Sequence, residues 1–379
     1  MSVSSKPRVL LGMSGGVDSS VAAYLLKKAG YDVIGITLKI WPQDCLTRAE
    51  DKCCGPQAVA DARMVAHALD IPHYVLDEAE SFSRMVIDYF TEEYRQGRTP
   101  IPCVLCNEKL KFGKLRTTAA SLGAEYIATG HYARVEHFND GRPSVLRRAI
   151  DRRKDQSYFL FSLSPDQLRK ILFPIGHLNK NEVREIAQSL GLKVYDKEES
   201  QEICFVPNND YLAFLKSHYQ THHLQFKTGG IYHRDGRYLG EHTGIENYTI
   251  GQRRGLPGGQ GQPLYVIHID AEQHRIIVGP ESDLMRQDCL LQRVNWLQSP
   301  PSPDENLEVK LRHNAPPVRA RVHQLPDNQA RLVFDEPQSG IAPGQAAVFF
   351  RDDLVIGGGW VTQQDKATSL EVVADAAIK

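Results

Sequence analysis

One stretch near the start of the chain has the residues to bind a phosphate group. Ser14–Ser20 reads Ser-Gly-Gly-Val-Asp-Ser-Ser and lies between the apolar run Arg8–Met13 and the helix-like segment Val21–Lys28. Glycines let backbone N–H groups converge on an anion, and the start of a helix adds the positive end of its dipole. The spacing differs from that of a Walker A loop and of a dinucleotide-binding Rossmann loop. The alternative is an ordinary strand-to-helix turn with a serine cap.

Cysteines form a second group that could do chemistry. Cys103 and Cys106 make a Cys-x-x-Cys pair just ahead of a predicted helix, and Cys204 lies far downstream in a polar setting. A helix N-terminus and three following lysines would favour the thiolate of Cys106. A pKa lowered from about 8.5 to about 7 takes a thiol from a few per cent to roughly half ionised at neutral pH. A structural zinc half-site or a buried pair would use the same residues, although no second Cys-x-x-Cys completes a zinc site.

Composition limits the remaining possibilities. The chain has 379 residues, enough for two or three domains, and its 45 Lys and Arg nearly balance 46 Asp and Glu, so any RNA site must be a local patch. The first residues lack the apolar core of a signal peptide, and no apolar run is long enough to span a bilayer, so we expect a cytoplasmic protein.

Its seven cysteines are then reactive, metal-binding or buried. Cys289 is predicted to be a small core residue. Cys45, Cys53 and Cys54 would form either a separate redox or metal group or part of a loop.

The elements that must position these residues alternate between strand and helix up to about Cys204. This rhythm predicts a Rossmann-like, doubly wound parallel sheet, with ligands at the carboxyl ends of its strands. The expected strands are Arg8–Met13, Asp32–Leu38, Tyr74–Leu76 and Glu125–Gly130, and the expected helices are Gln57–Leu69, Phe82–Tyr94 and Asn107–Leu122.

A hairpin with its turn at 139–141 should follow, then helical text at Ser157–Leu163 and Pro165–Leu172. A capping box at Asn179–Glu182 should open a helix that runs to Leu190.

Beyond residue 208 the chain becomes β-rich. After a short helix at Asp210–Tyr219, strands are expected at Tyr265–Ile269, Arg275–Val278, Leu307–Leu311 and Ala346–Phe350, separated by Gly and Pro. We therefore expect a catalytic domain at 1–208, a small β-rich domain at 209–282, a C-terminal β-barrel at 283–364, and a flexible tail at 365–379.

Seven motifs give the chain a family resemblance. The Ser14–Ser20 stretch is the PP-loop signature of the ATP pyrophosphatase superfamily, whose members cleave ATP to AMP and pyrophosphate. With the other motifs it resembles the tRNA-specific 2-thiouridylases, which thiolate the wobble uridine of tRNA. The motifs, in chain order, are Gly12–Ser20, Leu105–Asn107, Ala128–Ala133, Lys154–Leu160, Glu199–Phe205, Thr249–Leu256 and Ala342–Ala346.

The resemblance implies that ATP adenylates the C2 oxygen of the uridine. Mg²⁺ should accompany ATP, with Asp18 as a candidate ligand or, alternatively, a helix cap. The ATP-binding residues that it implies are Gly12, Met13, Ser14, Gly15, Gly16, Val17, Asp18, Ser19, Leu38 and Gly130.

For the sulfur step, the resemblance implies a persulfide on Cys204 and a partner nucleophile in Cys106, which together end as a disulfide. The chain departs from the commoner family pattern at Cys103, where many members carry Asp. Cys103, Cys106 and Cys204 could instead hold an iron–sulfur cluster as the sulfur carrier.

The resemblance also implies an RNA site, with a pocket for a flipped base and contacts to phosphates. Its implied tRNA contacts are Ile101, Pro102, Cys103, His131, Lys154, Asp155, Gln156, Arg312, His313 and Gln345. Further basic candidates are Arg147-Arg148, Arg152-Arg153 and Arg253-Arg254, each of which could equally be solvated surface. The implied partners are tRNA, through its anticodon arm, and a cysteine desulfurase or sulfur-relay protein, and we expect a monomer.

Two other classes fit part of the sequence. Another PP-loop synthetase that adenylates a small metabolite would explain Ser14–Ser20 but would leave Cys106, Cys204 and the β-rich half without a role. A non-catalytic RNA-binding or metal-sensing protein with a relic nucleotide loop is the second.

Overall fold

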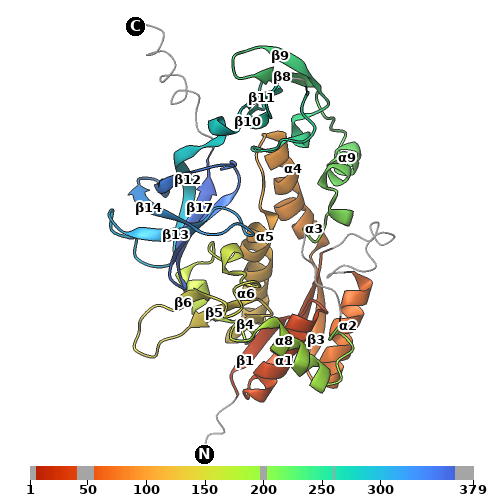
Figure 1. Cartoon of the computed structure of the whole chain (residues 1–379). Helices are drawn as coiled ribbons and strands as arrows, with labels where there is room; N and C mark the ends of the chain where they lie inside the picture. Colours follow the sequence, from red (N-terminus) through yellow and green to blue (C-terminus); the bar gives the residue numbers. More distant parts are fainter. Residues whose placement is uncertain (1–5, 41–54, 197–202, 259–260, 363–379) are drawn as a thin grey trace, which may run out of the picture. The chain divides into compact units, whose positions relative to one another are not determined.

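The protein is described by a computed structural model that covers residues 6–40, 55–196, 203–258 and 261–362 (Figure 1). Cys45, Cys53, Cys54 and the expected tail at 365–379 lie outside the described residues. The chain divides into two compact units. The first contains Met1–Tyr89, Pro102–Phe214 and Asp352–Val355, and the second contains Phe90–Ile101, Leu215–Arg351 and Ile356–Lys379. Each unit is described by itself below.

The first unit is built on a five-stranded parallel sheet in the order β3-β2-β1-β4-β7. This arrangement confirms the predicted Rossmann-like fold. The order reverses between β1 and β4, and such a switch point is where open α/β sheets bind ligands. The strands are β1 (Arg8–Gly12), β2 (Asp32–Lys39), β3 (His73–Asp77), β4 (Tyr126–Thr129) and β7 (Ile171–Leu172).

Helices cover both faces of this sheet because the strand residues are apolar on both sides (Figure 1). Val9 and Leu11 are fully buried in one core cluster with side chains of α1 (Val17–Lys28), α2 (Pro56–Ala68) and α8 (Lys180–Ser189). Alternate residues of a strand point to opposite faces, and a Cβ on Gly12 would meet Leu115 of α6 (Phe112–Ser121) at 3.4 Å. The sheet is therefore doubly wound.

Two predicted helices are each longer and less regular than the sequence suggests. The first consists of α3 (Ala79–Phe82), a π-helical turn, η2 (Ser83–Ile87), and α4 (Asp88–Arg95). The second begins at α5 (Pro102–Leu105) and continues through a π-helical turn, η3 (Cys106–Lys111), into α6. The prediction that this helix begins after Cys106 was wrong, because Pro102 serves as a first helical residue, where its missing N–H costs nothing.

The segment between the sheet and α8 contains less helix than predicted. Only the 3₁₀ turn η4 (Ser157–Phe159) and the four-residue α7 (Pro165–Leu168) form, and the chain then enters β7. The hairpin and the capping box are confirmed: β5 (Ala133–Glu136) pairs antiparallel with β6 (Val145–Arg148), and Asn179 and Glu182 cap α8 reciprocally.

In the second unit, a four-stranded sheet of order β10-β11-β8-β9 surrounds a small core of Ile231, Val266, Ile276 and Val278. Its strands are β8 (Gly229–His233), β9 (Tyr238–His242), β10 (Tyr265–Asp270) and β11 (Arg275–Gly279). The helix α9 (Tyr211–Thr221) precedes it in the chain, close to its predicted position.

The last part of the chain is the predicted barrel. Its strands run in the order β12-β15-β14-β13-β16-β17, and β12 also pairs with β17, which closes the sheet. Cys289 on β12 is 2% exposed, and burial raises the pKa of its thiol to about 12, so it is an inert core residue as predicted. The strands are β12 (Arg286–Trp296), β13 (Asn306–Lys310), β14 (Val318–Leu325), β15 (Gln329–Gln338), β16 (Ala346–Arg351) and β17 (Leu354–Val361).

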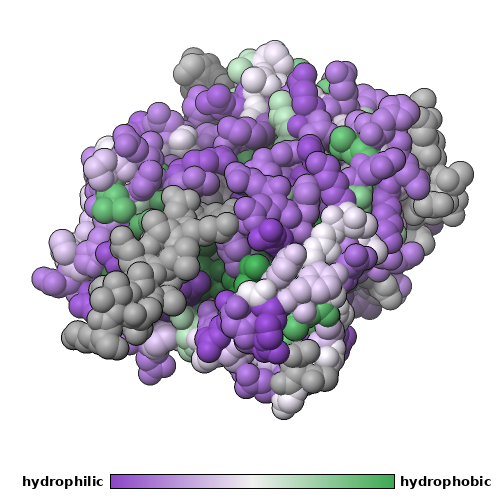
Figure 2. All heavy atoms as spheres, turned by 90° about the horizontal axis from the view of Figure 1, so that it is seen from above, coloured by the Kyte–Doolittle hydropathy of each residue, from purple (hydrophilic) through white to green (hydrophobic). Residues whose placement is uncertain are grey.

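The molecular surface is polar where it can be seen. The face drawn in Figure 2 is mostly hydrophilic, and hydrophobic side chains show only in small patches. Among the described residues, no helix is both long enough and apolar enough to cross a bilayer.

Candidate active site

The loop after β1 has the geometry of an anion site. Gly15 adopts a left-handed conformation (φ +70°), and α1 then begins at Val17 with Gly16 as its N-cap residue. No side chain in the described part of the chain caps this N-terminus, and its first N–H groups point toward the space in front of the helix. The loop is held by Ser19, whose hydroxyl accepts the Ser14 N–H at 3.2 Å and donates to the Gly16 carbonyl at 3.1 Å. This is the arrangement that favours a phosphate group.

The two loop glycines provide a matched pair of substitutions. A Cβ on Gly15 would lie 2.1 Å from the carbonyl oxygen of Ala58, and the positive φ adds strain, whereas a Cβ on Gly16 would meet only Ser14 Oγ at 3.5 Å. Gly15→Ala should therefore weaken ATP binding by about tenfold or more and lower stability by roughly 1–3 kcal/mol, while Gly16→Ala should leave the stability near that of the wild type. Equilibrium ATP titration and thermal unfolding of both variants measure this, and equal effects would contradict it.

The other predicted ATP residues meet this loop at the carboxyl edge of the sheet. Leu38 is half-buried near the end of β2, and Thr37 beside it donates its hydroxyl to the Met13 carbonyl at 2.8 Å. Gly130 follows β4, and a Cβ there would lie 2.6 Å from the backbone nitrogen of Ser19. Only glycine permits this approach to the first turn of α1. The structure thus brings Gly12–Ser19, Leu38 and Gly130 together at the switch point.

Asp18 is neither a helix cap nor an open metal ligand in this structure. Its Oδ1 accepts the Tyr132 hydroxyl at 2.8 Å, and the Lys180 ammonium lies 2.8 Å from Oδ1 and 3.0 Å from Oδ2. Lys180 is 7% exposed, and its Nζ also lies 5.6 Å from the centre of the Tyr132 ring. The carboxylate is therefore already neutralised by the protein, and the side chain joins α1 to α8.

Cys103 and Cys106 lie on the long helix that begins at Pro102. Cys106 is buried at the first residue of η3, and Cys103 is half-buried one turn earlier. The neighbour of Cys106, Asn107, donates its side-chain amide to the Phe159 carbonyl at 3.1 Å. This bond ties the helix that carries Cys106 to the turn after the candidate RNA segment Lys154–Gln156.

Cys204 is half-buried and lies just after the part of its motif, Glu199–Glu202, that falls outside the described residues. The next residue, Phe205, is 1% exposed and packs edge-on against Phe82 of α3, with ring centres 5.6 Å apart. The turn η3, which carries Cys106, also packs against α3. The two cysteine segments are thus attached to one shared helix.

The described residues do not form a ready metal site. No group of three or more His, Cys, Asp or Glu side chains in the described part of the chain is arranged to hold a metal ion. Cys103, Cys106 and Cys204 therefore do not fit an iron–sulfur cluster in this conformation, and the Asp18 carboxylate, a candidate Mg²⁺ ligand, is paired with Lys180.

Four predicted RNA contacts, His131 and Lys154–Gln156, lie near the same edge of the first unit. The side chains of two of them, Asp155 and His131, are buried and already hydrogen-bonded within the protein. Asp155 is 5% exposed and accepts the N–H groups of Ala149 and Ser157 and the Ser157 hydroxyl. His131 is 9% exposed and hydrogen-bonds Thr129 Oγ1 at 2.7 Å, and burial, with a smaller effect of Lys111, holds its pKa well below the usual range.

Lys154 and Gln156 are the more accessible members, and both are half-buried. The Gln156 side-chain oxygen accepts the Tyr132 N–H at 2.9 Å, and the Gln156 N–H donates to the Tyr132 carbonyl at 2.8 Å. Gln156 is therefore fixed to Tyr132 by its side chain and by its backbone.

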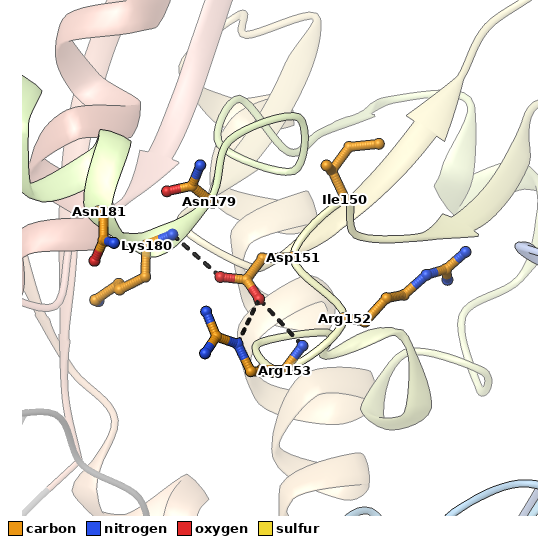
Figure 3. Close-up of a pocket in the computed structure, with 7 residues that line it drawn as sticks. All are labelled: Ile150, Asp151, Arg152, Arg153, Asn179, Lys180 and Asn181. Carbon is orange, nitrogen blue, oxygen red and sulfur yellow. Dashed lines mark hydrogen bonds and ion pairs between the residues drawn. The ribbon is translucent and has the colours of Figure 1, made fainter.

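A pocket of about 420 Å³ lies beside this segment, at the N-terminus of α8 (Figure 3). Asp151 lies at its centre and accepts the N–H groups of Arg153 and Lys180 at 3.1 and 3.2 Å. The side chains of Arg152 and Arg153 border the pocket, and that of Arg153 is 90% exposed. These two arginines keep their place as candidate phosphate contacts next to Lys154.

The remaining RNA candidates belong to the second unit, except Pro102, which is buried at the start of α5. Ile101 is 7% exposed. Gln345 donates to the Thr99 carbonyl at 3.0 Å, and Arg312 hydrogen-bonds the Gly340 carbonyl through its guanidinium. His313 is half-buried on the same turn as Arg312.

Sequence reasoning missed Lys180 and Tyr132 as site residues. Tyr132 lies inside the motif Ala128–Ala133, and Lys180 lies inside the predicted capping box Asn179–Glu182. Neither pattern assigns the residue to the ATP loop. A lysine at the first position of a helix is unusual, because the helix dipole disfavours a cation there. That position was the one available signal.

Three family models match the chain. A model described as the tRNA methyl transferase HUP domain matches residues 7–208, the tRNA methyl transferase PRC-barrel domain matches 217–280, and the aminomethyltransferase beta-barrel domain matches 286–361.

Relatives match over nearly the full length. The tRNA-specific 2-thiouridylase MnmA of Rhodospirillum centenum is 46% identical, covering 98% of this chain and 95% of that protein. The protein of the same name from Carboxydothermus hydrogenoformans is 45% identical, covering 96% of this chain and 100% of that protein. A solved 4-thiouridine synthetase–RNA complex with bound ATP is 17% identical with a TM-score of 0.35, covering 56% of this chain and 50% of that one, which is too weak a likeness to support a conclusion.

Proposed function

The chain belongs to the tRNA-specific 2-thiouridylase family, and from this premise we propose that it replaces the C2 oxygen of the wobble uridine in tRNA with sulfur at the expense of ATP. The observation that carries the proposal is the gathering of the loop Gly12–Ser19 and Gly130 at the switch point of a sheet, in a unit where two cysteine segments also pack against one helix, α3. The description of the matching family model names a methyl transferase, whereas we propose the transfer of sulfur. A nucleotide loop with two thiols suits sulfur insertion better, because the loop can activate an oxygen and the thiols can supply its replacement.

In the first step, the uridine C2 oxygen attacks the α-phosphorus of ATP and pyrophosphate leaves. The product is an AMP ester at C2, which turns a poor leaving group into a good one. The uncapped N–H groups of α1 and the converging loop amides would stabilise the charge on the phosphates. Mg²⁺ would accompany the triphosphate, and we assign it no protein ligand because Asp18 is engaged by Lys180 and Tyr132.

In the second step, the terminal sulfur of a Cys204 persulfide attacks C2 and AMP departs. The Cys106 thiolate then attacks Cys204 Sγ, which breaks the persulfide S–S bond, leaves sulfur on the base and forms a Cys106–Cys204 disulfide. The sulfane sulfur is reduced by two electrons and the two thiols are oxidised by two, so an external dithiol must restore the enzyme. An iron–sulfur cluster on Cys103, Cys106 and Cys204 is the second route, and the absence of a gathered ligand set among the described residues disfavours it.

The proposal assigns RNA contacts to both units. In the first they are Pro102, Cys103, His131 and Lys154–Gln156, with Arg152 and Arg153 beside them. In the second they are Ile101, Arg312, His313 and Gln345, most of them in the barrel proposed for 283–364. A cysteine desulfurase or relay protein would load Cys204, and we place the monomeric enzyme in the cytoplasm, where this tRNA is made.

The test is mass spectrometry of nucleosides from unmodified tRNA after incubation with the protein, ATP, a dithiol, and a cysteine desulfurase with cysteine as the source of sulfane sulfur. We expect one uridine to gain the mass difference between sulfur and oxygen, only when ATP is present, with release of AMP and pyrophosphate. In a parallel incubation with a methyl donor such as S-adenosylmethionine, a gain of one CH₂ instead would support methyl transfer. Turnover of ATP without tRNA would point to a small-metabolite synthetase.

A further inference from the structure

The residue that joins the candidate RNA segment to the ATP loop is Tyr132. Its backbone N–H and carbonyl are both bound by Gln156, at 2.9 and 2.8 Å, and its hydroxyl donates to Asp18 in the first turn of α1 at 2.8 Å. Tyr132 is 3% exposed, so its ring has little room to move independently of its neighbours. One buried side chain therefore connects a segment that sequence assigns to RNA with the loop that sequence assigns to ATP.

We propose that Tyr132 is a positioning residue that makes the binding of tRNA and of ATP favour each other. This inference rests on the function proposed above. A tRNA that contacts Lys154 or Gln156 fixes the Gln156 side chain, and both hydrogen bonds then fix the Tyr132 backbone. The hydroxyl of Tyr132 in turn fixes the Asp18 carboxylate, and with it the start of the helix whose N–H groups bind phosphate.

The same segment is also connected to the sulfur chemistry. Asn107, next to Cys106, donates to the carbonyl of Phe159, and the Phe159 N–H donates to the Gln156 carbonyl at 3.0 Å. Ordering of residues 154–159 by RNA would therefore stabilise both the ATP loop and the helix of Cys106. Hydrolysis of ATP by water before the tRNA is bound would waste ATP, and this connection would disfavour it.

The coupling is measured as a thermodynamic cycle. Full-length protein is titrated with α,β-methylene ATP, which cannot release pyrophosphate, with and without saturating unmodified tRNA. We expect tRNA to raise the affinity for the analogue by about fivefold or more in the wild type and by less than about twofold in Tyr132→Phe, and the analogue to raise tRNA affinity by the same factor. Tyr132→Phe keeps the buried ring and removes only the hydroxyl.

Two further variants make the result decisive. Gln156→Ala removes the side-chain bond to the Tyr132 N–H and keeps the backbone bond to the Tyr132 carbonyl, so at saturating tRNA it should lower the coupling toward that of Tyr132→Phe. Tyr219→Phe is the matched control, because Tyr219 is 2% exposed and donates its hydroxyl to Glu246 in the second unit. It should keep the wild-type coupling.

The outcomes separate the inference from the function. Wild-type coupling in Tyr132→Phe, or a wild-type protein that binds both ligands independently, overturns the role of Tyr132 and leaves the proposed thiolation intact. A wild-type protein that binds neither ligand overturns the proposed function itself. If Tyr132→Phe lowers the affinity for the analogue by the same factor with and without tRNA, the coupling is unchanged and the role of Tyr132 is merely structural.

Discussion

Cys204→Ser should abolish thiolation and leave adenylation in place. Serine cannot carry sulfane sulfur, so we expect the rate of thiolated tRNA formation to fall below about one thousandth of the wild-type rate, as for the loss of a nucleophile in other enzymes. The ATP loop lies between β1 and α1, and Cys204 belongs to neither element, so ATP binding and adenylation should be unaffected. Two products are measured in the same reaction: thiouridine, by mass spectrometry, reports thiolation, and tRNA-dependent release of pyrophosphate reports adenylation. A variant that still thiolates would contradict the persulfide assignment.

Cys103→Asp is the matched control for this prediction. It places at position 103 the residue that many members of the family carry, and Cys103 is half-buried in the first turn of a helix, where a carboxylate is favourable. The persulfide route needs only Cys106 and Cys204, so Cys103→Asp should keep most of the activity. A cluster route would lose its third ligand and its activity. The iron content and visible absorbance of protein purified without oxygen distinguish the same two routes. Active, colourless, iron-free protein would support the persulfide.

The fold could be predicted from the sequence where its causes are local. The apolar run at Arg8, the glycines after it and the reciprocal cap of Asn179 and Glu182 each act within a few residues, and the structure contains all three features. The parallel sheet followed from the alternation of short apolar runs with amphipathic segments. The barrel followed in the same way from short alternating strands separated by Gly and Pro.

Where the prediction failed, tertiary packing decided the structure. The Ser157–Leu172 stretch has helical periodicity, but Ile171 is needed to extend the parallel sheet beside Ile127, and only short turns remain before it. The helix of Cys106 begins at Pro102, five residues earlier than a periodicity argument placed it.

Most of the predicted ATP residues form one contiguous motif, Gly12–Ser19, which a sequence can show, whereas the side chains that support this loop come from distant positions. The side chains of Lys180 and Asp18 are 162 positions apart in the chain, and their contact depends on α8 packing against α1. The same holds for Tyr132 and Asp18, which meet only because β4 lies beside β1. Long-range pairs of this kind leave no periodic pattern in one sequence.

Lys180→Met should be the most disruptive substitution outside the loop itself. Methionine fills a similar volume, but it leaves the Asp18 carboxylate, whose side chain is 32% exposed, without its cation. Removing one partner of a buried pair costs about 3–5 kcal/mol, and the partial exposure of Asp18 lowers our expectation to about 2–3 kcal/mol of unfolding free energy. The unneutralised charge would also repel a triphosphate bound at the proposed ATP loop, so ATP affinity should fall by about tenfold or more.

The control is Lys27→Met on the same helix. Lys27 lies 3.5 Å from Asp70 with both side chains exposed, and a surface pair of this kind contributes about 0–1 kcal/mol. The unfolding free energy, from chemical denaturation, and the ATP affinity, from titration, should therefore both be clearly lower in Lys180→Met than in Lys27→Met. Similar losses in both would mean that Lys180 contributes no more than a surface lysine.

A second change tests the cause of the Lys180 effect. If the loss comes from an uncompensated charge, adding Asp18→Asn to Lys180→Met should restore most of the stability, because the amide remains a hydrogen-bond acceptor for the Tyr132 hydroxyl and carries no charge. Losses that simply add would instead mean that the packing of the lysine stem between α1 and α8 matters more than its charge. In that case ATP affinity should stay low in the double variant as well, since the start of α1 would still be poorly held.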